Sequence, residues 1–419
     1  MNILIKSATI IDSKSDYHNQ KLDILVEKGV ITKIGRSINN PKKYKELRLD
    51  NLHISQGWFD SSVCFGEPGY EERETLENGL KTAASSGFTA VAVNANTNPV
   101  IDSNSDITFL KSRAKGNIVS LLPIGALTKK SKGLELAELF DMQNSGAVAF
   151  SDYKKSTSNA NLLKLALQYS CGFEGLICSF PQDNNIAGIG VMNEHVTSAT
   201  LGLKGIPNVA EELQVARDLF LLEYSGGKLH IPTISTGKSV ELIRQAKAKK
   251  LDVSCSVAIH NLCLSDELVK EFDTKYKVLP PLRSRKDIDA LIEGLKDGTI
   301  DMVTTDHNPL DIEHKRVEFD HASYGTIGLE SAFGALQSIY TMKKSIELLT
   351  KGKGRFKVGI DSINIGNKLN ITLFNPSINY MFSTNNIVSK SKNCIFIDQK
   401  LKGIVYGVMA NNQIHLNHQ

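Results

Sequence analysis

The sequence predicts an α/β protein, a TIM-like (β/α)8 barrel with a small β-sandwich domain built from both chain termini. Residues 55–367 alternate short apolar runs with amphipathic helical patterns, which is the signature of a parallel sheet. This segment holds about eight strand–helix pairs, the number that closes a barrel. Residues 1–54 and 368–419 contain short strand patterns separated by turn residues, and they need no helix.

The strand patterns of the two ends are short and apolar, with turn residues between them. In the N-terminal part, strands are expected at residues 3–11, 21–26 and 30–34. In the C-terminal part, strands are expected at residues 369–374, 394–397 and 403–409. We expect these six segments to pair in one domain beside the barrel.

The barrel segment contains eight expected strands. They begin near residues 57 and 88 and continue at 118–123, 147–150, 175–180, 228–234, 253–258 and 302–306. Amphipathic helices are expected between them, among others at residues 71–84, 210–224, 239–249 and 286–296. Because all these strands are parallel, polar residues that follow them meet at one end of the barrel.

Composition excludes several classes of protein. The formal net charge is only +4 over 419 residues, and no long block of Lys or Arg indicates nucleic-acid binding. No uncharged apolar run approaches the roughly 18 residues of a membrane span, and the first residues resemble a strand more than a signal peptide. The six cysteines form no CxxC pair. We expect a cytoplasmic protein with reduced thiols.

The segment around the first barrel strand is the most informative. Residues 60–69 read DSSVCFGEPG, and residues 94–99 read NANTNP. Further segments read PPLR at 280–283 and GTIGLE at 325–330, and Thr305 is followed by Asp306 and His307. Together these segments resemble the dihydroorotases of the amidohydrolase superfamily, of the type found in multifunctional complexes. The resemblance extends over almost the whole chain.

The resemblance implies a hydrolase of pyrimidine biosynthesis that interconverts dihydroorotate and N-carbamoyl-aspartate. Such enzymes use zinc-bound hydroxide, because zinc lowers the pKa of water toward neutrality. The family places metal-binding histidines at four positions where this chain has other residues. Those positions are Ser62, Cys64, Phe180 and Thr233. A neutral serine hydroxyl is a poor zinc ligand, and phenylalanine cannot coordinate a metal.

Some carboxylates of the family pattern remain. Asp306 matches the aspartate that ligates metal and acts as general acid/base, and Asp152 matches one member of an Asp-Asp doublet. Asp152 is equally compatible with a helix cap or a loop residue. His230 also remains, but an odd spacing from Thr233 predicts that the two face opposite sides of a strand. We therefore interpret His230 as a structural, hydrogen-bonded histidine.

The substrate contacts implied by the resemblance are largely changed. Asn96 matches a substrate-binding asparagine. An arginine that would hold the substrate carboxylate is replaced by Gly66, and two further contacts are replaced by Leu279 and Leu310. Glycine and leucine offer no donor for an anion.

These replacements favour a dihydroorotase-like protein that is catalytically inactive, binds no cofactor and has a structural or regulatory role. A homodimer is expected, and aspartate carbamoyltransferase or another pyrimidine-pathway enzyme is a candidate partner by analogy alone. The alternative is an active metal-dependent cyclic amidohydrolase, with zinc held by Cys64, Asp152 and Asp306. A third hypothesis is a binding module for a small uncharged ligand in an apolar barrel mouth.

Overall fold

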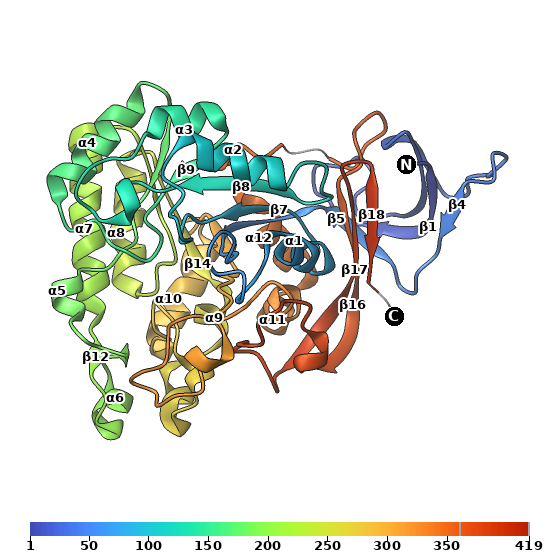
Figure 1. Ribbon diagram of the computed structural model, residues 1–419. Coiled ribbons are helices and arrows are strands. Elements are labelled where there is room, and N and C mark those ends of the chain that lie inside the picture. The colour runs from blue at the N-terminus through green and yellow to red at the C-terminus, as the bar shows by residue number, and fades with distance from the viewer. Residues whose placement is uncertain (360–361, 418–419) are drawn as a thin grey trace.

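A barrel of eight parallel strands forms the centre of the molecule, which confirms the predicted fold class (Figure 1). The computed structural model describes residues 1–359 and 362–417. Each predicted barrel strand is present within a few residues of its expected position. In order around the barrel they are β6 (Trp58–Val63), β7 (Phe88–Val93), β8 (Ser120–Gly125), β9 (Ala149–Phe150), β10 (Leu176–Cys178), β13 (Lys228–Ile231), β14 (Val253–Ala258) and β15 (Met302–Thr304).

Asp60 joins the first and last barrel strands. Its side chain is 1% exposed and accepts hydrogen bonds from the Thr304 hydroxyl at 2.5 Å and from the Thr305 N–H at 2.8 Å. The Ser62 N–H donates to the same carboxylate at 2.9 Å. Just beyond these bonds, Val63 and His307 form a parallel bridge. The side chain of one aspartate thus holds together the strand pair at which the sheet closes.

We expect the Asp60→Ala variant to lose about 2–4 kcal/mol of unfolding free energy, because several buried donors lose their acceptor at once. Urea unfolding followed by circular dichroism measures the loss. Asp60→Asn is the matched variant of the same shape, and it should retain part of the stability. An unchanged unfolding midpoint in Asp60→Ala would show that the barrel closes without this carboxylate.

Helices surround the barrel (Figure 1). The longer ones are α1 (Leu76–Ser85), α2 (Asn104–Arg113), α3 (Leu139–Ser145), α4 (Ala160–Cys171), α7 (Asn208–Ser225), α8 (Gly237–Ala248), α10 (Arg285–Lys296), α11 (Ala332–Ile339) and α12 (Met342–Lys351). Short elements complete the loops: α5 (Asn184–Ala187), β11 (Met192–Asn193), α6 (Val196–Leu201), β12 (Gly205–Ile206) and α9 (Ile259–Cys263). Within the described part of the chain, no helix is both long and apolar enough to cross a membrane.

Helix α1 begins five residues later than its predicted start at residue 71. Thr75 caps the helix by accepting a hydrogen bond from the Asn78 N–H at 3.2 Å, and Glu67 accepts one from the Leu76 N–H at 2.9 Å. Residues 66–74 form a loop instead, in which the Tyr70 N–H donates to the Gly66 carbonyl at 2.8 Å. The helical periodicity of the sequence did not reveal these caps.

Both chain ends pair in one mixed eight-stranded sheet with its own apolar core, beside the barrel (Figure 1). Its strands are β1 (Ile3–Ile10), β2 (Lys21–Glu27), β3 (Val30–Gly35), β4 (Lys45–Leu47), β5 (His53–Gln56), β16 (Ile371–Met381), β17 (Lys400–Ala410) and β18 (Gln413–Leu416). The N-terminal and C-terminal parts meet where β5 and β16 run antiparallel.

The predicted strand at residues 394–397 is wrong. Cys394 forms one isolated bridge with Ile327, and the chain then turns, with the Ile397 N–H facing the Cys394 carbonyl. Cys394, Ile395 and Phe396 are buried against the barrel loops, where the Ile395 N–H donates to the Thr326 hydroxyl at 2.9 Å, and Ile397 is partly buried. A short apolar run does not distinguish a strand from a buried turn.

Candidate functional site

The carboxyl ends of three barrel strands carry an unusual backbone. Tyr153, Thr233 and Asp306 follow β9, β13 and β15, and their φ angles are +57°, +48° and +50°. Positive φ is uncommon for residues other than glycine, and a β-branched threonine adopts it rarely. Such conformations cost about 1–3 kcal/mol each and gather at functional sites. Three residues in this uncommon conformation therefore gather at the same end of the barrel.

An ion pair lies at the centre of this mouth. The Lys154 ammonium contacts Asp306 at 2.7 Å between Nζ and Oδ2, and the two side chains are 12% and 2% exposed. Burial raises the pKa of the Asp306 carboxyl, and the Lys154 charge opposes this increase. The second carboxylate oxygen of Asp306 has no hydrogen-bond partner among the described residues. Lys154 could not be recognised from the sequence, because no pattern marks a lysine two residues after Asp152 as a partner of Asp306.

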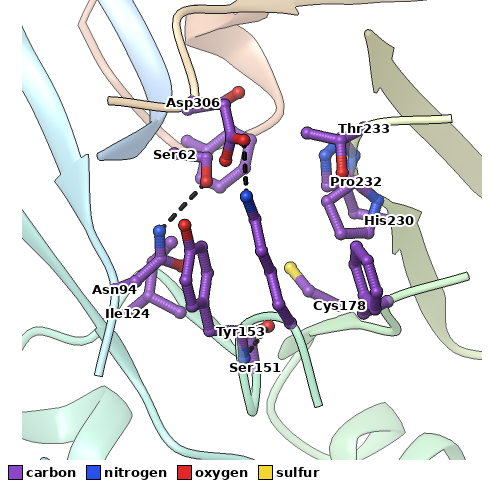
Figure 2. A pocket seen from close by; sticks show the side chains of 14 residues that line it. Ser62, Asn94, Ile124, Ser151, Tyr153, Cys178, His230, Pro232, Thr233 and Asp306 are labelled. Carbon is purple, nitrogen blue, oxygen red and sulfur yellow. Dashed lines mark hydrogen bonds and ion pairs between the residues drawn. The ribbon is translucent and has the colours of Figure 1, made fainter. Parts of the chain in front are cut away.

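The cavity around the ion pair is small (Figure 2). The centre of a water molecule can occupy about 20 Å³ of this cavity, so the cavity has room for about one water. Ser62, Asn94, His230 and Thr233 line it together with the ion pair. Phe180 also lines it, and this side chain packs in one apolar cluster with residues that include Ile206 and Leu279. The space beside the ion pair is therefore narrow, and Phe180 and its apolar neighbours form part of its wall.

The four positions of the family's histidines lie in or beside this cavity. Ser62 and Thr233 line it with short polar side chains, and the Ser62 hydroxyl accepts a hydrogen bond from Asn94 at 3.0 Å (Figure 2). Phe180 presents only a ring. Cys64 is 3% exposed, and its thiol lies near the Tyr153 hydroxyl and Asp306. The four positions could be predicted from the sequence, whereas Asn94 and Tyr153 became recognisable as their neighbours only in the structure.

Asp152 points away from the cavity. Its carboxylate accepts hydrogen bonds from the Thr128 N–H at 3.0 Å and the Thr128 hydroxyl at 2.5 Å. The fallback zinc set of Cys64, Asp152 and Asp306 is therefore not brought together. Residues 1–359 and 362–417 contain no group of three or more His, Cys, Asp or Glu that could hold a metal ion.

The zinc that the fold family implies does not fit the residues at this mouth. Zinc requires three or four ligands among histidines, carboxylates and thiolates. Asp306 is the carboxylate at the cavity, and an ammonium group already contacts it at 2.7 Å. Burial raises the pKa of the Cys64 thiol to about 12, so the thiolate that would bind zinc is strongly disfavoured.

We expect Cys64 to resist thiol reagents in the folded protein. With its pKa raised to about 12 by burial, the thiolate fraction at pH 8 falls on the order of a thousand-fold below that of an ordinary cysteine. Exposed Cys171 should react within minutes, and the Cys171→Ser variant controls for it. Mass spectrometry after iodoacetamide treatment identifies the modified residue. Rapid labelling of Cys64 in the native protein would mean that the mouth opens readily.

The predicted separation of His230 and Thr233 is wrong, since both line the cavity. Strand β13 ends at Ile231, and Thr233 lies in the following turn with its positive φ, so the strand alternation no longer applies. His230 is buried, its Nδ1 lies 2.9 Å from the Ser254 hydroxyl, and burial lowers its pKa to about 3. His230 is thus a neutral histidine with a structural hydrogen bond.

The positions of the family's substrate contacts are also buried or closed. The Asn96 side-chain oxygen is buried without a hydrogen-bond partner in the described part of the chain, and neighbouring Asn94 reaches the cavity instead. A Cβ atom at Gly66 would lie 1.9 Å from the Tyr70 carbonyl oxygen, so this loop leaves no space for an arginine. Leu279 and Leu310 are 8% and 5% exposed. We find no cationic group at these positions that would bind a substrate carboxylate.

Solved structures place the fold in one class. The L-hydantoinase (dihydropyrimidinase) of Arthrobacter aurescens superposes with a TM-score of 0.86 over 100% of this chain and 98% of that chain, at 19% identity. A D-hydantoinase superposes with a TM-score of 0.83 over 100% of this chain and 96% of that chain, at 18% identity. This likeness shows that the chain has the same barrel fold as these hydantoinases over its whole length.

Sequence relatives identify the family within this class. A sequence model described as Dihydro-orotase-like matches residues 53–239. A protein named dihydroorotase from Caldanaerobacter subterraneus is 38% identical, over 99% of this chain and 97% of its own length. Another from Acetivibrio thermocellus is 39% identical, over 98% of each chain. The chain belongs to the dihydroorotase family.

Proposed function

We propose that this member of the dihydroorotase family has no dihydroorotase turnover of its own and serves a structural or regulatory role in cytoplasmic pyrimidine biosynthesis. The observation that carries the proposal is the Lys154–Asp306 ion pair in a cavity with room for about one water. The positive charge at the centre of the mouth is therefore the Lys154 ammonium group.

The residues at the mouth lack the groups that hydrolysis of a cyclic amide needs. A six-membered ring with a carboxylate is several times larger than one water, so it does not fit this cavity. An ammonium group offers no coordination site at which water could become a nucleophile. Burial raises the pKa of Asp306, but the Lys154 ammonium contacts its Oδ2 and lowers this pKa, which weakens the carboxylate as a base toward water.

Metal content and turnover test the proposal together. We expect protein purified with excess zinc to retain less than about 0.1 equivalent of metal, since too few ligands are present. Dihydroorotate hydrolysis and the reverse cyclisation should equal the background without enzyme. A dihydroorotase that retains the four histidines, assayed in parallel, controls the measurement. Stoichiometric zinc together with turnover would overturn the proposal.

The alternative of an active enzyme with an atypical ligand set is favoured by 36–39% identity to curated dihydroorotases over nearly the whole chain. It requires Asp152 to leave Thr128 and Lys154 to leave Asp306. The hypothesis of a binding module requires Phe180 to move away from Ile206 and Leu279, so that a ligand can enter the mouth. Thermal-shift measurements with uncharged cyclic amides test this reading, because a ligand that binds only the folded state raises its melting temperature.

A structural role needs a binding partner, and aspartate carbamoyltransferase remains a candidate by analogy with the pathway. Co-purification of the two proteins at physiological salt tests this partner. A second copy of the chain is the other candidate partner.

A further inference from the structure

A cleft of about 570 Å³ lies where the sheet of the two chain ends meets the barrel. One wall consists of residues from the segment 11–18, which follows β1, and of Gln56 at the end of β5. Helix α12 forms the other wall. Volumes of about 300–1,000 Å³ are typical of small-molecule sites, which often lie between domains. The cleft and the mouth cavity share no described lining residue, so they are separate places.

Positively charged side chains predominate in the lining of this cleft. Its charged residues are Lys14, Lys343, Lys344, Lys351, Asp12 and Glu347. The Lys344 ammonium contacts the Glu347 carboxylate at 2.9 Å. The other three lysines are exposed and form no ion pair with any residue that the structure describes. Because like charges gathered around one cleft repel each other, an anion between them would be stabilised.

The Asp12 carboxylate shapes the wall and does not pair with these lysines. Its side chain is 6% exposed. One oxygen accepts hydrogen bonds from the Lys14 N–H at 3.0 Å and from the Gln56 side-chain amide at 2.9 Å. The other oxygen accepts one from the Ile363 N–H at 2.8 Å. Neutral donors therefore occupy the carboxylate, and they fix the segment after β1 in place.

His18 adds a donor of fixed orientation to the same wall. Its Nδ1 accepts a hydrogen bond from the Asp12 N–H at 3.1 Å, so the proton of the neutral ring is on Nε2. His18 itself lines the cleft. Ammonium groups and this ring N–H can only donate, so the matching ligand is one whose oxygen atoms carry negative charge.

We propose that this cleft binds a small phosphate monoester of the sugar-phosphate type. A phosphate monoester carries about −1.5 to −2 charges at pH 7 and has three strongly accepting oxygens. With four lysines and two carboxylates, the lining has a formal charge of +2, which matches this ligand. Three hydroxyl side chains provide partners for the hydroxyl groups of a sugar, namely those of Ser13, Thr341 and Thr350.

Helix α12 connects the cleft with the barrel mouth. It packs against β6 and β15, the strands that lead to Ser62 and Asp306. Gln56, in the opposite wall, lies two residues before β6. A ligand that joins the two walls would therefore restrain the strand pair at which the barrel closes. The inference goes beyond the role proposed above, and it holds equally for a catalytic and a non-catalytic mouth.

Isothermal titration calorimetry at about 20 mM salt, where screening is weak, tests the proposal with ribose 5-phosphate as the probe. Ribose 5-phosphate should bind, whereas ribose, which lacks the phosphate, should not. Lys343→Met should weaken binding about 10-fold, since a charged hydrogen bond is lost. Lys81→Met is the matched control, because Lys81 is an exposed lysine that lines a different cleft, and it should leave binding unchanged.

Three results would contradict the proposal. One is the absence of binding at ribose 5-phosphate concentrations up to about 10 mM, which corresponds to a negligible affinity. Another is an equal loss of binding in Lys343→Met and Lys81→Met, which would indicate a general charge effect. The third is equally tight binding of inorganic phosphate, because the sugar would then make no contact with the cleft.

Amide hydrogen exchange locates the ligand without any substitution. With saturating ribose 5-phosphate, exchange should slow in residues 11–18 and in α12, because the ligand joins these two walls. Exchange in α2 should stay the same, since no residue of this helix lines the cleft within the described part of the chain. Protection at the barrel mouth instead of the two walls would overturn the proposal.

Discussion

Lys154→Met is expected to lose about 3–5 kcal/mol of unfolding free energy, because removing one partner leaves a buried carboxylate without its counter-charge. Asp306 is 2% exposed, so bulk water does not replace the ammonium. Urea unfolding monitored by circular dichroism measures the loss. The double variant Lys154→Met with Asp306→Asn should recover most of it, since no charge then remains buried.

An exposed ion pair provides the control for this experiment. Lys344 contacts Glu347 at 2.9 Å on the surface of α12, and Lys344→Met should change stability by about 0–1 kcal/mol. If Lys154→Met were equally mild, the ion pair at the mouth would not be the interaction that holds Asp306.

The penalty of Lys154→Met should depend on pH. Burial raises the pKa of Asp306, and the Lys154 charge that lowers it is absent from the variant. A carboxyl whose pKa is higher in the folded than in the unfolded state takes up a proton on folding, so stability falls as pH rises through that range. The loss relative to wild type should therefore be larger at pH 8 than at pH 5.

Restoring the four histidines should not by itself restore zinc binding. In a variant with Ser62→His, Cys64→His, Phe180→His and Thr233→His, Lys154 still holds Asp306 and repels a second cation. We expect less than about 0.1 equivalent of zinc in this variant and about one equivalent when Lys154→Ala is added. Metal analysis after dialysis measures both.

Three controls make this comparison decisive. Lys154→Ala alone should bind no zinc, and the far-UV spectra and melting temperatures of all variants establish that each one folds. Equal zinc in the two histidine variants would mean that Lys154 does not block metal binding. Zinc in neither folded variant would mean that the backbone at the mouth has moved away from metal-binding geometry.

The barrel could be predicted from the sequence because its strands are short apolar runs that alternate with helices. The positions of Ser62, Phe180 and Thr233 at one mouth could also be predicted, since they lie at the ends of parallel strands. Lys154 could not be predicted in this way. A lysine in a loop is usually solvated, and only the three-dimensional position of Asp306 makes it a buried partner.

Two other predictions failed for separate reasons. Side chains alternate between the two faces of a strand, but β13 ends at Ile231. The alternation therefore does not extend from His230 to Thr233. The orientation of Asp152 depends on Thr128, which is 24 residues away in the sequence. Long-range contacts of this kind leave no periodic signal, so they became visible only in the structure.

The sheet made from both chain ends has a consequence for the synthesis of the protein. Strand β5 pairs with β16, and the hydrogen bond between the Trp58 N–H and the Thr372 hydroxyl spans 314 residues of chain. At about 5–20 residues per second, a ribosome needs roughly 15–60 s to make the intervening chain. During this time one edge of the N-terminal strands is open to other nascent chains. We expect the first 56 residues to be the part of the newborn protein that most needs a chaperone.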